Sequence, residues 1–306
     1  MSASDPYRVV SNIQSLLQQV TRTRAARDYW TAERRARARP LSITIDSSVP
    51  HRKRLSGGSR VQAFSAPTPP LIPLVPPRPP TFNTHQVAEA GLGQSPYFVV
   101  GKLFGTTGID YTASAFVIGE RTVLTAAHCV FEGNAGFARY LMFAAQLDGT
   151  ANAGSWQLPI IATLGGWIDS TDPDPQFDIA IAISNSPITP TTGKVDVAIS
   201  SSPPAGGEIT SLGYPATPLP GYRFDGNKMW ECDGSYITTA GNIVVMSNNL
   251  TDGCSGGPWF PKGGPPQAIG LNSRRPTDET ERLRSPVFGQ GMRNLIQWMK
   301  DHGGDP

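Results

Sequence analysis

The sequence has few cysteines and no long apolar runs, which argues against a disulfide-rich secreted domain, a zinc-binding domain and a membrane-spanning protein. Its three cysteines are too few for the disulfide framework of a small secreted domain, and they do not form a zinc-binding pattern: Cys129, Cys232 and Cys254. No apolar run approaches the roughly 20 residues that a membrane-spanning helix needs. Charged residues make up 16% of the chain and hydrophobic residues 39%, so we expect a soluble protein with no transmembrane segment.

The first 30 residues also lack the pattern of a signal peptide. This stretch carries four arginines and no uninterrupted apolar core of the required length. We therefore expect a cytoplasmic protein; the alternative is secretion by a route that the sequence does not reveal. One disulfide can form among three cysteines, and Cys232–Cys254 is the pair to test first. Three reduced, buried thiols are an equal alternative for a cytosolic chain.

The charges divide the chain into a basic beginning and an acidic remainder. Residues 1–60 contain 12 Lys and Arg against 4 Asp and Glu, whereas the rest contains 14 against 20. From residue 5 to about residue 39, apolar side chains recur with the period of an amphipathic helix: Val9, Ile13, Leu16, Leu17 and Val20. The sequence therefore predicts that residues 1–65 are a basic N-terminal helical segment, serving as a pro-segment or docking module. Basic stretches alone are weak evidence for nucleic acid, and none is expected as a partner.

Proline and glycine mark the next boundary and the character of the body. Residues 66–80 contain eight prolines, which permit neither helix nor sheet ladder, and predict a semi-rigid linker. Beyond it, residues 81–306 alternate short apolar runs with Gly, Pro, Asn or Asp, the spacing of a β-barrel or sandwich. The chain ends on an amphipathic pattern over residues 290–302, which predicts a helix stopped by two glycines.

Ser255 has the surroundings that a nucleophilic hydroxyl needs. It lies in the run Gly253-Cys254-Ser255-Gly256-Gly257, where the glycines permit a sharp turn and leave the hydroxyl uncrowded. In this turn the backbone amides of Gly253 and Ser255 would converge as an oxyanion hole on the oxygen that becomes negative during attack. A serine hydroxyl is a poor nucleophile at neutral pH, so a histidine must accept its proton.

Among four histidines, only His128 lies inside the body at the end of an apolar run, followed by Cys129. A triad also needs a buried carboxylate that fixes the tautomer of the imidazole. Asp178 begins a run too apolar to hold an unpartnered carboxylate, and it is the predicted third member.

These motifs, in this order and spacing, resemble the chymotrypsin-like serine proteases, and most closely their bacterial glutamyl-endopeptidase-like branch. Further matches are Gly165-Gly166-Trp167, Gly213-Tyr214-Pro215 and Trp230. The resemblance implies an all-β fold of two perpendicular six-stranded antiparallel β-barrels with a C-terminal helix, preceded here by the basic N-terminal helix and the Pro-rich linker. It implies a serine endopeptidase that hydrolyses protein or peptide substrates through an acyl-enzyme, with His128, Asp178 and Ser255 as its triad. No metal or cofactor is needed.

The chain departs from that family at several informative positions. Cys254 stands where digestive members carry the Asp that binds the new N-terminus on activation. Ser114-Ala115 stand where the cysteine partner of Cys129 would be expected. The specificity pocket that the resemblance implies contains three uncharged residues, Asn249, Leu250 and Asn272. These residues hint at an uncharged side chain in the substrate.

Other functions remain open from the residues alone. The spacing Gly253-x-Ser255-x-Gly257 also matches the nucleophile elbow of α/β-hydrolases, but a helix cannot begin well at the Gly-Gly-Pro that follows. The body could be a catalytically silent, protease-like binding module. A third alternative is an intracellular protease gated by a regulatory partner that binds residues 1–60.

Overall fold

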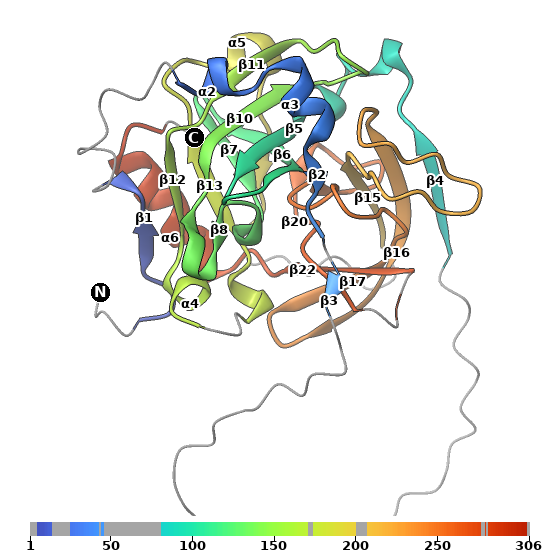
Figure 1. Cartoon of the computed structure of the whole chain (residues 1–306). Helices are drawn as coiled ribbons and strands as arrows, with labels where there is room; N and C mark the ends of the chain where they lie inside the picture. The colour runs from blue at the N-terminus through green and yellow to red at the C-terminus, as the bar shows by residue number, and fades with distance from the viewer. Residues whose placement is uncertain are drawn as a thin grey trace, which may run out of the picture.

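The computed structural model describes residues 5–13, 25–42, 44–45, 81–170, 174–199, 207–276, 279 and 281–304. Strands dominate these residues and gather into two curled sheets, one on each side of the molecule in Figure 1. The all-β, double-barrel fold expected from the sequence is confirmed. The predicted linker at 66–80 lies outside the described residues.

The first sheet contains nine strands. Its six central strands are antiparallel to their neighbours in the order β12-β13-β7-β6-β5-β10, with β1 and β11 at the ends and β2 beside β6. Their bounds are β1 Val9–Ser11, β2 Arg39–Pro40, β5 Val100–Thr106, β6 Asp110–Gly119, β7 Thr122–Thr125, β10 Arg139–Ala145, β11 Gly154–Gln157, β12 Ile160–Leu164 and β13 Ala180–Ile183.

The second sheet contains seven strands. Six follow in the antiparallel order β20-β18-β15-β16-β17-β22, and β4 pairs with β16. Their bounds are β4 Phe82–Gln86, β15 Glu208–Gly213, β16 Trp230–Ala240, β17 Ile243–Ser247, β18 Pro258–Pro261, β20 Gly270–Leu271 and β22 Arg282–Pro286.

Short elements complete the chain. Two-stranded pairs join β8 Phe131–Glu132 to β9 Gly136–Phe137, β14 Asp196–Val197 to β19 Gln267–Ala268, and β3 Thr44–Ile45 to β21 Arg275–Pro276. The α-helices are α2 Ala25–Tyr29, α3 Ala32–Arg37, α4 Gly165–Ile168, α5 Thr189–Thr192 and α6 Gln290–Asp301. Single 3₁₀ turns are η2 Glu89–Gly91, η3 Tyr97–Val99, η4 Ala127–Cys129, η5 Gly133–Ala135 and η6 Pro175–Phe177.

Each sheet encloses a hydrophobic cluster. The larger cluster gathers inward-facing residues of the first sheet, such as Phe116, Leu124 and Phe143, and extends to α6. The smaller one fills the second sheet around Trp259. Strands β6 and β10, which are buried along nearly their whole length, contribute to the larger cluster.

The predicted C-terminal helix is confirmed as α6. Met292, Leu295 and Met299 are buried on one face, the positions that the 3.6-residue period brings together. The helix ends before Gly303, which adopts the left-handed φ of +80° that a glycine favours. No helix within the described parts of the chain is long and apolar enough to cross a membrane.

The predicted N-terminal helix is wrong over its first part. Val9–Ser11 form strand β1, which pairs antiparallel with residues 162–164 of β12. Arg8 holds this strand in place through a two-pronged ion pair with Asp169, at 2.5 and 2.7 Å. The edge strand β12 has main-chain N–H and C=O groups that can pair with another strand, and a local sequence pattern does not reveal such an edge. Helices do occur later in the segment, as α2 and α3, while residues 14–20 of the expected stripe lie outside the described residues.

Candidate active site

His128 lies at the end of β7, in the 3₁₀ turn η4. Its side chain is only 14% exposed, and its backbone N–H donates to Asp178 Oδ1 at 2.9 Å. The ring nitrogen Nδ1 lies 3.1 Å from Asp178 Oδ1 and 2.9 Å from Oδ2. The carboxylate therefore holds both the main chain and the ring of His128.

The register of two antiparallel strands explains why Asp178 meets His128. Ala180 of β13 pairs with Thr125 of β7, so residues just before β13 lie beside residues just after β7. Asp178 is fully buried, and its Oδ2 also accepts a hydrogen bond from Ser273 Oγ at 2.5 Å. Arg274 Nε lies 4.0 Å from the same oxygen, so the buried charge is well compensated.

The two partners shift each other's protonation. Burial by itself lowers the pKa of His128, but the Asp178 carboxylate and the neighbouring Cys129 together outweigh burial and raise the pKa above its ordinary 6.5. Burial by itself raises the pKa of Asp178, whereas the His128 charge and hydrogen bond, with Arg274 and Ser273, lower it below its ordinary value. The pair therefore favours an ionised carboxylate beside a basic imidazole.

The loop that carries Ser255 is shaped by two glycines and held by Ser114. Gly253 and Gly256 have φ values of +94° and +81°, a left-handed conformation that other residues rarely adopt. Ser114 Oγ donates to the Gly253 carbonyl at 2.9 Å, and its backbone N–H donates to the Ser255 carbonyl at 2.7 Å. A side chain at Gly256 would collide with Thr125 and with the Ser114 carbonyl. Ser114, which stands where a bridging cysteine was expected, thus braces this loop against β6 with hydrogen bonds.

Asn272 was predicted to line the specificity pocket, and the structure places it in the framework behind the loop instead. Its Nδ2 donates to the carbonyls of Leu212 and Cys254, at 2.9 and 3.1 Å. Its Oδ1 accepts from Ser211 Oγ at 2.7 Å and from Trp259 Nε1 at 2.6 Å. All four hydrogen-bonding positions of this fully buried carboxamide are used, so it fixes the loop and does not face a substrate.

We expect Asn272→Leu to lower the free energy of unfolding by about 3 kcal/mol or more, since it leaves several buried polar groups without partners. Urea denaturation of the purified protein measures this loss. Asn134→Leu, at an exposed position, is the matched control and should change stability by less than about 0.5 kcal/mol. Equal stabilities for the two variants would contradict the framework role of Asn272.

The other two predicted pocket residues, Asn249 and Leu250, lie next to Arg275, which no sequence motif indicated as part of the site. Asn249 is buried and accepts a hydrogen bond from Thr84 Oγ1 at 2.5 Å, while Leu250 belongs to the apolar core of the second sheet. Arg275 is 6% exposed, and its Nη2 donates to the carbonyls of residues 248 and 250, at 3.1 and 2.6 Å. A guanidinium thus lies against the wall formed by residues 248–250.

The expected Cys232–Cys254 bridge is not formed. Cys129, Cys232 and Cys254 are all free and buried, which matches the alternative of three reduced thiols. Burial raises the pKa of Cys232 to about 11 and raises that of Cys254 as well. The thiols of Cys232 and Cys254 are therefore neutral packing groups, because a buried thiolate is disfavoured.

The hydroxyl and the imidazole nitrogen between which a proton would move are both free of other hydrogen bonds in the described part of the chain. Ser255 Oγ and His128 Nε2 are both buried, and neither has a hydrogen-bond partner among the described residues. Asp178 holds the opposite nitrogen of the same ring. Across the described ranges, no group of three or more His, Cys, Asp or Glu side chains could hold a metal ion.

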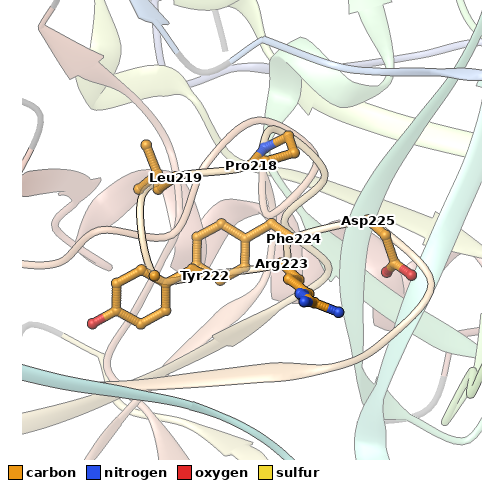
Figure 2. Close-up of a pocket in the computed structure, with 7 residues that line it drawn as sticks. Pro218, Leu219, Tyr222, Arg223, Phe224 and Asp225 are labelled. Carbon is orange, nitrogen blue, oxygen red and sulfur yellow. The ribbon is translucent and has the colours of Figure 1, made fainter.

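Ser273, Arg274 and Arg275 are the site residues that the sequence reasoning missed. They follow Asn272 in the chain, and Ser273 and Arg274 approach Asp178 although 95 or more residues separate them in sequence. No local motif marks such a contact. A hollow elsewhere, lined by residues 218–219 and 221–225 with the rings of Tyr222 and Phe224 stacked, contains none of the predicted site residues (Figure 2).

Comparison with known proteins supports one family. The family profile described as Trypsin matches residues 85–299, which is most of the chain. No curated protein sequence matches. Among solved structures, the thermostable serine protease AL20 from an extremophilic microorganism is 27% identical, with a TM-score of 0.58, and the match covers 66% of this chain and 96% of that one.

Two further solved structures share the fold. The protease Anisep from Arthrobacter nicotinovorans is 24% identical, with a TM-score of 0.59, and the match covers 66% of this chain and 95% of that one. A Glu endopeptidase in complex with MPD is 19% identical, with a TM-score of 0.60, and the match covers 71% of this chain and 96% of that one.

Proposed function

The chain belongs to the trypsin family and is a serine endopeptidase, and from this premise we propose that it hydrolyses peptide bonds through Ser255, His128 and Asp178. The observation that supports this proposal is the buried contact of 2.9 Å between His128 Nδ1 and Asp178 Oδ2. This contact leaves Nε2 of the same ring as the nitrogen that can accept a proton. A histidine in this state converts the weakly nucleophilic serine hydroxyl into an attacking group.

The proposed reaction proceeds in two halves. His128 Nε2 accepts the Ser255 proton while Oγ attacks the peptide carbonyl, and Asp178 stabilises the imidazolium that forms. The amides of Gly253 and Ser255 hold the oxyanion, and one such donor contributes about 2.7–4 kcal/mol to the barrier reduction. His128 then protonates the leaving amine, and water hydrolyses the acyl-enzyme by the same route in reverse.

Labelling by a fluorophosphonate probe tests the nucleophile. The probe should label the wild-type protein and should leave Ser255→Ala unlabelled, because the reactive hydroxyl is the group removed. Both proteins are tested intact and after cutting within residues 46–80, so that the N-terminal segment can leave. A folded wild-type protein that stays unlabelled in both forms would contradict the proposed mechanism and favour the silent binding module.

We further propose that the substrate carries an uncharged side chain next to the cleaved bond. Asn249 supplies no negative charge to the pocket, and the Arg275 guanidinium lies against the carbonyls of residues 248 and 250. A second cation placed in this buried region would be strongly disfavoured.

Peptide-library profiling should therefore show no cleavage after Lys or Arg. The same library is run with Arg275→Met, which removes the charge but keeps an unbranched side chain. We expect this variant to relax the rejection of basic residues by about tenfold, which corresponds to about 1.4 kcal/mol. Efficient cleavage after Lys or Arg by the wild-type protein would contradict the proposed pocket.

A further inference from the structure

A stretch of the N-terminal segment, described at residues 39–42 and 44–45, runs between the two sheets. Figure 1 shows β2 and β3, in blue, between the green part and the orange part of the molecule. Arg39 and Pro40 pair in parallel with Tyr111 and Thr112 of β6 in the first sheet. Farther along, β3 pairs in parallel with β21, the short strand that follows Arg274 beside the second sheet. The same stretch is thus bound by main-chain hydrogen bonds on both sides.

Leu41 lies at the centre of this stretch and engages the proposed oxyanion hole. Its N–H donates to the Thr112 carbonyl at 2.9 Å, and its own carbonyl accepts the Gly253 N–H at 3.0 Å. Pro40 lies close enough that a Cβ on Gly253 would contact its Cβ at 3.5 Å. The Leu41 carbonyl therefore accepts the hydrogen bond of the Gly253 N–H, which a substrate oxygen would need.

The catalytic groups are not connected while this stretch is in place. Ser255 Oγ makes no hydrogen bond to His128 Nε2, and both atoms lack partners in the described part of the chain. Proton transfer requires that contact, so the Leu41 carbonyl is held without being attacked. On the other side, β3 occupies the edge of β21, two residues beyond the Ser273 that holds Asp178.

The segment is anchored before it reaches the cleft. Trp30 is 1% exposed, and its Nε1 donates to the Tyr140 carbonyl at 2.6 Å. Tyr29 stacks on the Tyr140 ring at 4.2 Å between centroids, and its hydroxyl donates to Asp110 at 2.6 Å. An exposed peptide of seven residues would pay a large ordering entropy to bind. The contacts of Tyr29 and Trp30 reduce this entropic cost, because they already hold the chain just before the stretch on the first sheet.

We propose that the stretch described at residues 39–42 and 44–45 is a built-in peptide inhibitor that fills the substrate cleft and takes the Gly253 amide through the Leu41 carbonyl. This inference rests on the proposed function. The inhibitor acts through main-chain pairing rather than through a side chain in the specificity pocket. Release of the anchor around Trp30, by cutting or by a partner that captures residues 25–37, frees the cleft.

The test compares variants of the full-length protein. Trp30→Ala removes an anchor outside the cleft and should raise the rate of fluorophosphonate labelling at least tenfold over wild type. Trp156→Ala is the matched control, because Trp156 lies on the same sheet and also donates its Nε1 to a carbonyl, that of Pro187, at 2.9 Å. The control should label at the wild-type rate.

A second experiment does not depend on the folding of a variant. A recognition site for a sequence-specific protease is inserted within residues 46–80, and the cut protein is diluted so that the released segment dissociates. Cutting and dilution should raise the labelling rate, and a synthetic peptide of residues 36–47 should lower it again. Mass spectrometry of the intact chain should show no cut between residues 41 and 42.

The outcomes separate the two proposals. Equal labelling of wild type, Trp30→Ala and the cut protein would overturn the inhibitor and leave the serine protease mechanism standing. Cleavage at residues 41–42 would also overturn it, because the stretch would then be a substrate. No labelling of any form would overturn the proposed mechanism, and the inhibitor with it.

Discussion

Ser255→Ala should reduce peptide hydrolysis by about 10⁶-fold, the size of the loss when a serine nucleophile is removed from a complete triad. The reason is that Ser255 carries the only hydroxyl in the glycine turn of residues 253–256. The measurement is kcat/KM on a reporter peptide, made with protein whose N-terminal segment has been cut and released.

The matched control for this substitution is Ser155→Ala, at an exposed position on β11. This substitution also removes one serine hydroxyl, from the first sheet, and the variant should keep wild-type activity. If Ser255→Ala kept activity within tenfold of the wild type while folded, the nucleophile would have to be another residue.

Asp178→Asn should lower kcat by about 10⁴-fold, because an amide in this place favours the wrong tautomer of His128. The pH dependence should change as well. Only neutral His128 can accept a proton, so the rate falls as the pH drops below the pKa of this histidine. The Asp178 carboxylate raises that pKa against the effect of burial, and its removal should move the acid limb of the profile to lower pH.

Ser273→Ala serves as the comparison for Asp178→Asn. It removes one hydrogen bond to Asp178 Oδ2 and keeps the carboxylate, so the midpoint of the acid limb should move much less. The pH profiles of kcat/KM for the three proteins measure these midpoints. An acid limb of Asp178→Asn at the wild-type pH or above would contradict the role assigned to the carboxylate.

The elements that the sequence predicted correctly depend on neighbours in the chain. The α6 helix follows from apolar residues at helical spacing, and the strand-rich body follows from short apolar runs between turn residues. The Ser255 turn is also local, because glycines at 253 and 256 supply the positive φ angles that it needs. Such patterns carry their own physical signal and could be recognised without coordinates.

The failures involve partners that lie far away in sequence. The apolar stripe that begins at Val9 satisfied the helical period, but the free edge of β12 bound residues 9–11 as a strand. Asn272 looked like a pocket residue by position, yet Ser211 and Trp259 direct its carboxamide into the framework. In both cases hydrogen bonds to distant residues outweighed the local pattern.

By itself, the sequence determined a strand-rich body and the closing helix from local spacing. Its resemblance to the chymotrypsin-like proteases implied the double barrel and the three residues proposed as the triad. Tertiary structure alone decided that the cysteines stay apart, that Ser273 and Arg274 support Asp178, and that the Leu41 carbonyl meets the Gly253 amide. More than 200 residues separate Leu41 from Gly253, and main-chain hydrogen bonds such as this one do not depend on side-chain identity. The residue types in a sequence therefore do not indicate such hydrogen bonds, and only the folded arrangement of both sheets brings the two main-chain groups together.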